Sequence, residues 1–470
     1  MKVLLIFPPI TLKERYGREI EDVGGILPPL GLAYLAAVLE EHNQHVEILD
    51  APALSLKVEQ LPHQVSKKNP DLIGISAITP FFHRTLEAVE MMKKVCPDTT
   101  TVLGGPHASL FPEQTLADNP SVDIVCIGEG ENTLLDLAQT IERGGDLRRI
   151  KGIAFRENGK IVRNQPREPI ENLDNLPFPA RHRLPMTVYK PLPNQYRRLP
   201  VIHLMASRGC PFGCTYCSNA VFGRRTRTRS PENVISEIKS VIQDFNAKEI
   251  QFWDDTFTLK RPWVMELCQL LIKENLGVLW TCETRVDRVD KEILELMARA
   301  GCWKIGYGVE SGDQELLDLV KKGITLDQVR RAVKLTKNSG IEVGLSFMLA
   351  LPSETPSKAR QSIEFAKELD PDYAQFCITT PYPGTELYDQ AKEYGTLIQD
   401  FSSYTIWNPV FVPRGYRDED EVLKMQREAF KAFYYRPSYI LKRLLKIRSI
   451  GDLRRNIEGH RLTAKFSAAD

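Results

Sequence analysis

The sequence predicts an α/β protein in which a doubly wound parallel sheet precedes a partial barrel of six strand–helix units and a helical C-terminal extension. Short apolar runs alternate with helical patterns over residues 1–145, and the same alternation starts again near residue 200. Strands that alternate with helices form parallel sheets with helices on their faces. Between the two regions, residues 167–185 are rich in proline and charge and lack periodicity, so they divide the chain.

The first region supplies five apolar runs of strand length, separated by helical patterns such as 31–42 and 85–95. The expected strands are 2–7, 46–50, 72–78, 100–105 and 123–128. Doubly wound sheets bind their ligands beyond the carboxyl ends of the strands. The residues at those ends are Asp50, Ser76, Gly104 to His107 and Gly128 to Glu131. We therefore expect a ligand-binding domain over residues 1–145.

A hairpin and a connector are expected next. Asn158-Gly159 lies between two alternating runs at 152–164, which is a strong signal for a two-residue hairpin turn. Together with the proline-rich segment, this hairpin is expected to link two domains over residues 146–195.

The second region supplies six further strand–helix units. The expected strands are 201–207, 249–255, 278–284, 304–310, 343–350 and 373–380. Pro231 stands at a favourable first position of the helix predicted for 231–245. Six units in about 180 residues fit an incomplete barrel over 196–385 better than a second flat sheet. Barrels carry their chemistry at the C-terminal ends of the strands.

Residues 386–470 are expected to be mainly helical. Residues 434–449, which read YYRPSYILKRLLKIRS, mix aromatic, aliphatic and basic side chains. This mixture is typical of a helix that lies on a membrane surface, but a helix that packs its apolar face on the barrel shows the same pattern. Both interpretations remain open.

The composition excludes several classes of protein. The net charge is +1, so no overall positive field favours nucleic acid. No run reaches the roughly 20 apolar residues that cross a bilayer, and the apolar start is broken by Pro8 and Pro9, which indicates a buried strand rather than a signal peptide. Nine cysteines, mostly scattered singly, indicate a reducing, cytoplasmic compartment rather than a disulfide framework.

One short segment concentrates reactive side chains. In ASRGCPFGCTYCSNA (206–220), Cys210, Cys214 and Cys217 have the spacing CxxxCxxC directly after the first strand expected in the barrel. Zinc normally takes four ligands from paired motifs, and here only the distant Cys268 or His203 is available as a fourth. A disulfide would leave one thiol over. The favoured interpretation is a 4Fe-4S cluster on three thiolates, whose open iron binds another ligand.

The segment RGCPFGCTYC, with Tyr216 before the last cysteine, resembles the radical S-adenosylmethionine superfamily. The resemblance implies a TIM-type barrel and S-adenosylmethionine on the open iron. Electron transfer from the cluster would then cleave the sulfonium to a 5′-deoxyadenosyl radical. Four later segments resemble the family: FWDDTFT, GYGVESGDQELL, FMLALPSET and TTPYPGTELY; ETRVD places Arg285 at the end of the third strand. They imply that Asp254 or Asp255 meets the amino group of the cofactor, that Arg285 meets its carboxylate or a nearby acid, and that Glu310 meets the ribose hydroxyls. Tyr216, and Ser311 at the turn, are expected to complete the S-adenosylmethionine site.

Four arginines follow the cysteines in FGRRTRTRSPE (222–232). They are interpreted either as a solvated loop or as contacts to an anionic cofactor or substrate.

The first region resembles the Rossmann-like cobalamin-binding domain of one branch of this superfamily. The matching segments are 28–41, 46–50, 102–113 and 123–137. The resemblance implies a cobalamin site lined by Ser76, Thr79, Gly104, Gly105, His107, Gly128 and Glu129. One departure is clear. Many cobalamin proteins carry DxHxxG, but DAPALS (50–55) has Pro52 in place of the histidine, so this loop supplies no histidine ligand to cobalt.

The resemblance implies an enzyme that methylates an unactivated carbon of a hydrophobic small molecule or lipid. One alternative is a ring-forming oxidation, because the branch contains the anaerobic magnesium-protoporphyrin monomethyl ester cyclase beside hopanoid- and isoprenoid-acting members. Another is a radical enzyme whose first domain only binds or senses. A transfer-RNA methylthiotransferase needs a second cysteine triad, but only Cys96 and Cys126 precede the motif. The expected partners are a one-electron donor such as ferredoxin or flavodoxin, and no nucleic acid.

Overall fold

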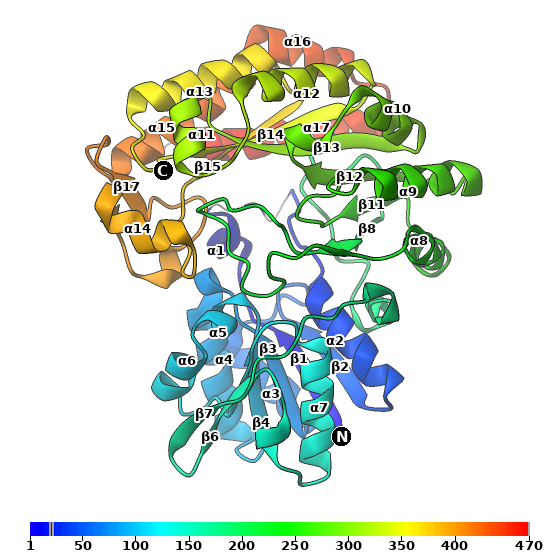
Figure 1. Ribbon diagram of the computed structural model, residues 1–470, viewed down its shortest axis with the longest axis vertical. Coiled ribbons are helices and arrows are strands. Elements are labelled where there is room, and N and C mark those ends of the chain that lie inside the picture. Colours follow the sequence, from blue (N-terminus) through cyan, green and yellow to red (C-terminus); the bar gives the residue numbers. More distant parts are fainter. Residues whose placement is uncertain (18–19, 21–22, 469–470) are drawn as a thin grey trace.

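The computed structural model describes residues 1–17, 20 and 23–468. It holds two large sheets, one in each half of the molecule, and the segment that carries the three cysteines runs between them (Figure 1). The front sheet lies in the blue and cyan half, and the barrel lies in the green and yellow half.

The front sheet has the strand order β2-β1-β3-β4-β5-β6-β7. Its strands are β1 (Lys2–Phe7), β2 (His45–Asp50), β3 (Leu72–Ser76), β4 (Thr100–Gly104), β5 (Ile124–Cys126), β6 (Ile153–Glu157) and β7 (Lys160–Arg163). The first five strands are parallel, and apolar side chains from both of their faces pack under helices. The helices are α1 (Leu12–Tyr16), α2 (Leu30–Glu41), α3 (Leu61–Lys68), α4 (Phe82–Val95), α5 (Pro106–Leu110), α6 (Pro112–Asp118) and α7 (Glu131–Glu142).

The hairpin at 152–164 forms as predicted, but it does not lie in a connector. Its first strand, β6, pairs antiparallel with β5, with Ile124 opposite Phe155, and β7 forms the outer edge of the front sheet. The physical reason is that β5 would otherwise leave a row of unpaired backbone groups at the sheet edge.

Six parallel strands form the incomplete barrel, in the order β15-β14-β13-β12-β11-β8. They are β8 (Val201–Leu204), β11 (Glu249–Phe252), β12 (Leu279–Thr284), β13 (Cys302–Glu310), β14 (Glu342–Leu349) and β15 (Tyr373–Ile378). The covering helices are α8 (Pro231–Phe245), α9 (Arg261–Glu274), α10 (Lys291–Arg299), α11 (Gln314–Leu319), α12 (Leu326–Asn338) and α13 (Pro356–Leu369). The apolar core lies between strands and helices. Within the described chain, β8 and β15 do not pair, so the barrel is open between them.

The C-terminal region packs against the open edge of β15. It contains α14 (Glu386–Tyr394), β16 (Gly395–Leu397), β17 (Phe411–Pro413), α15 (Glu419–Tyr434), α16 (Pro437–Leu445) and α17 (Ile450–Ser467). The Gln426 amide donates to the Phe376 carbonyl, and the Tyr434 hydroxyl bonds both backbone groups of Ala374. None of the helices that the structure describes has the length and apolar character needed to cross a bilayer.

Candidate functional site

The cysteine segment leaves β8 and is anchored by a short ribbon in which β9 (Ser207–Arg208) pairs with β10 (Arg227–Thr228). Gly209 precedes the first cysteine with φ of +89°, and a Cβ there would lie 2.5 Å from the Arg225 carbonyl oxygen. Only glycine fits both the backbone conformation and the close approach. Further along, the Thr215 N–H donates to the Val320 carbonyl, which fixes the segment to the barrel.

The three thiols lie on this one segment at the carboxyl ends of the barrel strands. Cys214 is buried, Cys210 is half-buried and Cys217 is exposed. A hydrogen bond with Cys217 lowers the pKa of the Cys214 thiol to about 6 and raises the pKa of Cys217. Cys210 Sγ lies 3.8 Å from Thr256 Oγ1, just beyond β11.

The thiols fit an iron–sulfur cluster better than a single ion. In the described part of the chain, no three His, Cys, Asp or Glu side chains converge closely enough to hold one metal ion. A 4Fe-4S cluster makes a different demand, because each thiolate binds its own iron atom and soft thiolates are its usual ligands. Cys210, Cys214 and Cys217 supply that donor chemistry.

The two aspartates beyond β11 have different surroundings. Asp254 is buried and accepts hydrogen bonds from the Ser207 hydroxyl, at 2.5 Å, and from the Ala206 N–H. Its burial raises its pKa to about 7. Asp255 is exposed, and it accepts a hydrogen bond from the Gly209 backbone beside the first cysteine. Asp254 therefore holds the start of the cysteine segment in place through its hydrogen bonds, whereas Asp255 is accessible to a ligand.

Arg285 lies against the cysteine segment. Its guanidinium is 3.8 Å from the centre of the Phe212 ring, and its Nε donates to Asp287 Oδ1 at 2.9 Å. The side chain is buried. The predicted arginine at the end of β12 and the cysteine loop are therefore in direct contact.

Glu310 ends β13 in a strained conformation, with φ of +71°. Its Oε1 accepts from Lys322 Nζ at 2.6 Å, and the same ammonium lies 3.2 Å from the Tyr216 hydroxyl. Gly308 makes this possible, because a Cβ there would lie 2.4 Å from Glu310 Oε1. Ser311 has a different role, since its hydroxyl bonds Ser362 on α13 and the Asp313 N–H.

Two residues of this site were missed at the level of sequence. Lys322 is one of two adjacent lysines, and no local pattern distinguishes it from Lys321. Glu283, on β12, faces Gly306, where a Cβ would lie 1.8 Å from its carboxylate oxygen. Desolvation raises the pKa of Glu283, and its carboxylate has no hydrogen-bonding partner among the described residues. The alternation of side chains along β12 was the available signal for an inward position.

In the front sheet, Ser76 and Gly104 are opposite each other at the ends of β3 and β4. Gly105 follows with φ of +96°, and a Cβ there would lie 2.9 Å from the Ala77 carbonyl oxygen. Glycine at 105 is thus required by the close packing of the chain on itself, and the Gly104 and Gly105 carbonyls accept hydrogen bonds from the Ala77 and Ser109 N–H groups. These residues lie at the strand ends, where a doubly wound sheet binds its ligand. Gly128, beyond β5, lies near the cysteine segment, since its Cβ would be 3.9 Å from the Val221 carbonyl oxygen.

His107 is enclosed by aromatic rings. The Phe82 ring centre is 4.0 Å from its own, Phe111 and Phe401 also contact it, and its Nδ1 is 3.2 Å from Thr79 Oγ1. Burial lowers its pKa to about 4, so the imidazole is neutral. Loop 50–55, which lacks the cobalt-binding histidine, is also covered by the chain itself. Asp50 accepts a 2.6 Å hydrogen bond from the buried Tyr189 hydroxyl.

Glu129 joins the two halves of the molecule. Its carboxylate accepts from Arg208 at 2.8 Å, from Arg227 at 2.7 Å and from the Ile170 N–H. Arg208 also binds Glu131 at 2.6 Å, and all four charged side chains are buried. The predicted cobalamin residue Glu129 therefore has its oxygens occupied by the chain's own donors, two of them on the ribbon that holds the cysteine segment.

The four arginines of 222–232 have separate environments. Arg227 binds Glu129, and Arg229 forms a buried ion pair with Glu237. Arg224 and Arg225 are exposed, and Arg225 pairs with Glu171 at the surface. Only Arg224 and Arg225 are therefore accessible to an external anion.

Two family models match the sequence. One is described as the radical SAM superfamily and covers residues 204–366, and the other is described as a B12 binding domain and covers residues 20–138. The chain is 36% identical over 444 residues to an uncharacterized methyltransferase of Pyrococcus horikoshii, with 94% of each chain covered. It is 31% identical over 449 residues to the anaerobic magnesium-protoporphyrin IX monomethyl ester cyclase of Rubrivivax gelatinosus, covering 94% of this chain and 78% of the relative.

Solved structures share the fold. The cobalamin-dependent S-adenosylmethionine radical enzyme OxsB, with aqua-cobalamin and S-adenosylmethionine bound, superposes with a TM-score of 0.74 at 19% identity, over 99% of this chain and 72% of OxsB. The radical S-adenosylmethionine methyltransferase TsrM of Kitasatospora setae, with cobalamin and a 4Fe-4S cluster bound, gives 0.67 at 20% identity, over 83% of this chain and 78% of TsrM. At these identities the likeness concerns the fold alone.

Proposed function

Because this chain belongs to the radical S-adenosylmethionine enzymes that carry a B12-binding domain, we propose that it methylates an unactivated carbon of a hydrophobic small molecule or lipid. Its cofactors are a 4Fe-4S cluster, S-adenosylmethionine and cobalamin. When bound, these groups supply one-electron chemistry, hydrogen abstraction and a methyl group. The protein contributes binding, orientation and the exclusion of water.

In this proposal Cys210, Cys214 and Cys217 hold the cluster. Asp255 takes the amino group of S-adenosylmethionine, because its neighbour Asp254 is occupied by the turn after β8. Arg285 and Glu310 act on the carboxylate and the ribose, as a cation and as a hydrogen-bond acceptor. Asp254, Ser311 and Tyr216 act as positioning residues that hold the segments carrying these groups.

For cobalamin we propose a cradle formed by Ser76, Gly104, Gly105 and Gly128. His107 and Glu129 act indirectly, since His107 packs under the loop beyond β4 and Glu129 fixes the ribbon before the cysteines. Pro52 and the Asp50–Tyr189 contact support a cobalt without a histidine ligand from loop 50–55.

One observation carries the proposal. The loops at the carboxyl ends of both sheets contact each other. Gly128, beyond β5, lies near Val221, which directly follows the cysteine segment, and Gly384, beyond β15, lies against Leu110, beyond β4. The carboxyl end of a strand is where both sheet types place their chemistry. A substrate between the two sheets would therefore meet the residues proposed for all three cofactors. We propose domain bounds of 1–145, 196–385 and 386–470, with the hairpin of segment 146–195 completing the front sheet and the rest of that segment as the connector.

An oxidative cyclisation is the second candidate. It is supported by the 31% identity to the magnesium-protoporphyrin cyclase, which extends over 94% of this chain. Both candidates need a small-molecule substrate and a one-electron donor, which we propose to be a ferredoxin or flavodoxin. All nine cysteines lie in the described part of the chain as free thiols, which supports a reducing, cytoplasmic setting.

The deciding experiment uses protein purified without oxygen and reconstituted with iron, sulfide and hydroxocobalamin. About four irons and one cobalt per chain, with 5′-deoxyadenosine formed on reduction, are expected. Supplying S-adenosylmethionine with a labelled methyl group then separates the two candidates. Label in the product supports methylation, and a dehydrogenated product without label supports cyclisation. If iron and 5′-deoxyadenosine are found without cobalt, the front domain acts only as a binding or sensing module.

A further inference from the structure

A cavity of about 740 Å³ occupies the open side of the barrel, between the last strand and the C-terminal helices. Its wall includes Tyr373 to Gln375 of β15, residues 192–195 before β8, and side chains of α16 and α17. The volume lies within the roughly 300–1,000 Å³ typical of small-molecule sites. The unpaired edges of β8 and β15 are therefore separated by a hollow that α17 covers.

The wall combines apolar surface with positive charge. Aromatic and aliphatic residues dominate it, among them Phe81, Leu192, Trp407, Leu453, Ile457 and Phe466. Arg15, Arg443, Arg455 and Arg461 also line it, and no Asp or Glu is among the described lining residues. Since the whole chain has nearly equal numbers of acidic and basic residues, this one-sided charge is a property of the cavity.

Arg443 contributes its guanidinium to the cavity wall, and one of its nitrogen atoms has no hydrogen-bond partner. It donates to the Tyr373 hydroxyl at 3.1 Å and to Asn456 Oδ1 at 3.2 Å, but its buried Nη1 has no hydrogen-bond partner. The nearest carboxylate oxygen, Glu342 Oε2, is 3.9 Å away. Glu342 Oε2 likewise has no hydrogen-bond partner, so the buried Nη1 faces this carboxylate rather than the cavity. The rest of the guanidinium lines the cavity and gives its wall a positive charge.

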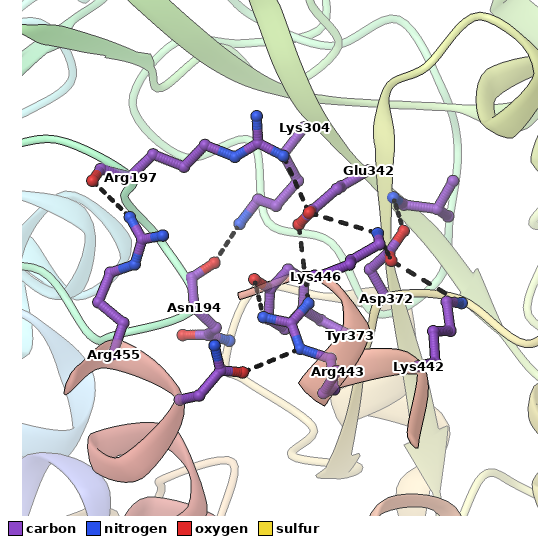
Figure 2. A network of polar contacts seen from close by, with 12 residues as sticks. Asn194, Arg197, Lys304, Glu342, Asp372, Tyr373, Lys442, Arg443, Lys446 and Arg455 are labelled. Atoms are coloured by element: carbon purple, nitrogen blue, oxygen red, sulfur yellow. Dashed lines mark hydrogen bonds and ion pairs between the residues drawn. The ribbon is translucent and has the colours of Figure 1, made fainter. Parts of the chain in front are cut away.

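The carboxylates near Arg443 are already neutralised (Figure 2). Glu342 pairs with Arg197 at 2.9 Å and with Lys446 at 3.4 Å, and Asp372 also pairs with Lys446. Lys442 and Arg455 pair with carboxylates outside the labelled set, Asp370 and Asp452. Arg443 forms a 3.9 Å ion pair with Glu342, a carboxylate that it shares with Arg197 and Lys446, so three basic groups share one negative charge.

The cavity extends from the loops beyond β3 and β15 to the surface of the C-terminal helices. At one end it is lined by Pro80 and Phe81, just beyond β3 of the front sheet, and by Tyr382, beyond β15. At the other end are α16 and α17, where several large apolar side chains are exposed: Ile440, Leu441, Leu444, Leu445, Ile450, Leu453 and Ile457. An elongated apolar molecule would thus extend from an apolar entrance to the facing strand ends.

We propose that this cavity binds an amphiphilic anion, with its hydrocarbon body along the aromatic wall and its acidic group against Arg443. Resting on the proposed function, we infer that this molecule is the substrate. A carboxylate or phosphate pairs well with a guanidinium in a partly desolvated site.

The first test uses two fluorescent probes, cis-parinaric acid and its uncharged methyl ester, titrated into the full reconstituted chain. The acid is expected to bind at least tenfold more tightly than the ester. Arg443→Met should remove this preference while the ester's affinity stays the same, and Arg448→Met, an exposed control that does not line the cavity, should change neither. Equal affinities of the two probes for the wild-type chain would overturn the proposal.

Two further variants guard against loss of folding in Arg443→Met. Arg461→Met changes an exposed side chain, so it should fold normally and weaken only the acid, by about threefold. Gly459→Leu adds volume where a Cβ meets no atom within 4 Å, and leucine favours the helix. It should weaken the binding of both probes tenfold, whereas Gly451→Leu on the same helix, the control, should not. Undiminished binding to Gly459→Leu would place the probes elsewhere.

5′-Deoxyadenosine formation, measured in parallel, tests the proposed function separately, because it does not require this cavity to be filled.

Discussion

Nζ of Lys322 lies 2.6 Å from Oε1 of Glu310, and both side chains are buried beside Tyr216 of the cysteine segment. The lysine orients the carboxylate at the end of β13, where a bound ribose is proposed to contact it. Lys322→Met should therefore weaken S-adenosylmethionine binding about tenfold, which corresponds to roughly 1.4 kcal/mol. Equilibrium binding to the anaerobically reconstituted protein measures this effect.

The adjacent lysine offers a matched control. Lys321 is exposed and pairs with Glu386 at the surface, so Lys321→Met should leave the affinity within twofold of the wild type. Similar losses in both variants would show that local charge, and not the contact with Glu310, determines binding.

The cluster assignment predicts a selective loss among the nine cysteines. Cys214→Ala removes one of the three proposed ligands, so iron content and 5′-deoxyadenosine formation should fall at least tenfold while the front domain still binds cobalamin. Cys96→Ala, in the front domain, should retain both. Iron analysis and product chromatography check this, and an active Cys214→Ala protein would refute the assignment.

The buried contact between Glu129 and Arg208 predicts a large effect on stability. Glu129→Gln leaves Arg208 and Arg227 with an uncompensated buried charge, which costs about 3–5 kcal/mol. Urea unfolding should show this loss in the transition that separates the two halves. Glu171→Gln breaks only the exposed pair with Arg225 and should cost less than about 1 kcal/mol. Equal costs would contradict an interdomain role for Glu129.

Glu354 predicts a pH dependence of stability. It is fully buried, accepts a 2.6 Å hydrogen bond from the Tyr416 hydroxyl, and burial raises its pKa from 4.5 to about 7. The folded protein therefore binds more protons than the unfolded chain between these values. Stability should fall as the pH rises through this window, with a contribution approaching about 1.4 kcal/mol per pH unit. Glu354→Gln should remove this contribution to the pH dependence of the free energy of unfolding. Denaturant titrations from pH 5 to 7 measure it, and an unchanged pH dependence in the variant would assign the effect to other groups.

Much of the fold and part of the site could be predicted because their signals are local. Alternating apolar runs mark strands and helices within a few residues, and two such series predicted the front sheet and the incomplete barrel, as the strand orders confirm. The three cysteines are close in sequence, so their spacing carries the chemistry without any knowledge of the fold. The hairpin turn at Asn158-Gly159 was also predictable, but its place at the edge of the front sheet was not, because strand pairing depends on which edge is free.

The sequence by itself therefore determined the order of the elements and the CxxxCxxC segment. Only the tertiary structure decided that Asp254 is occupied while Asp255 is accessible, that Lys322 rather than Lys321 meets Glu310, and that Glu129 binds Arg208. It alone decided that Arg443 of α16 lines a cavity beside β15. The physical reason is that burial and charge pairing depend on neighbours far away in the sequence, such as Glu129 and Arg208, which are 79 residues apart.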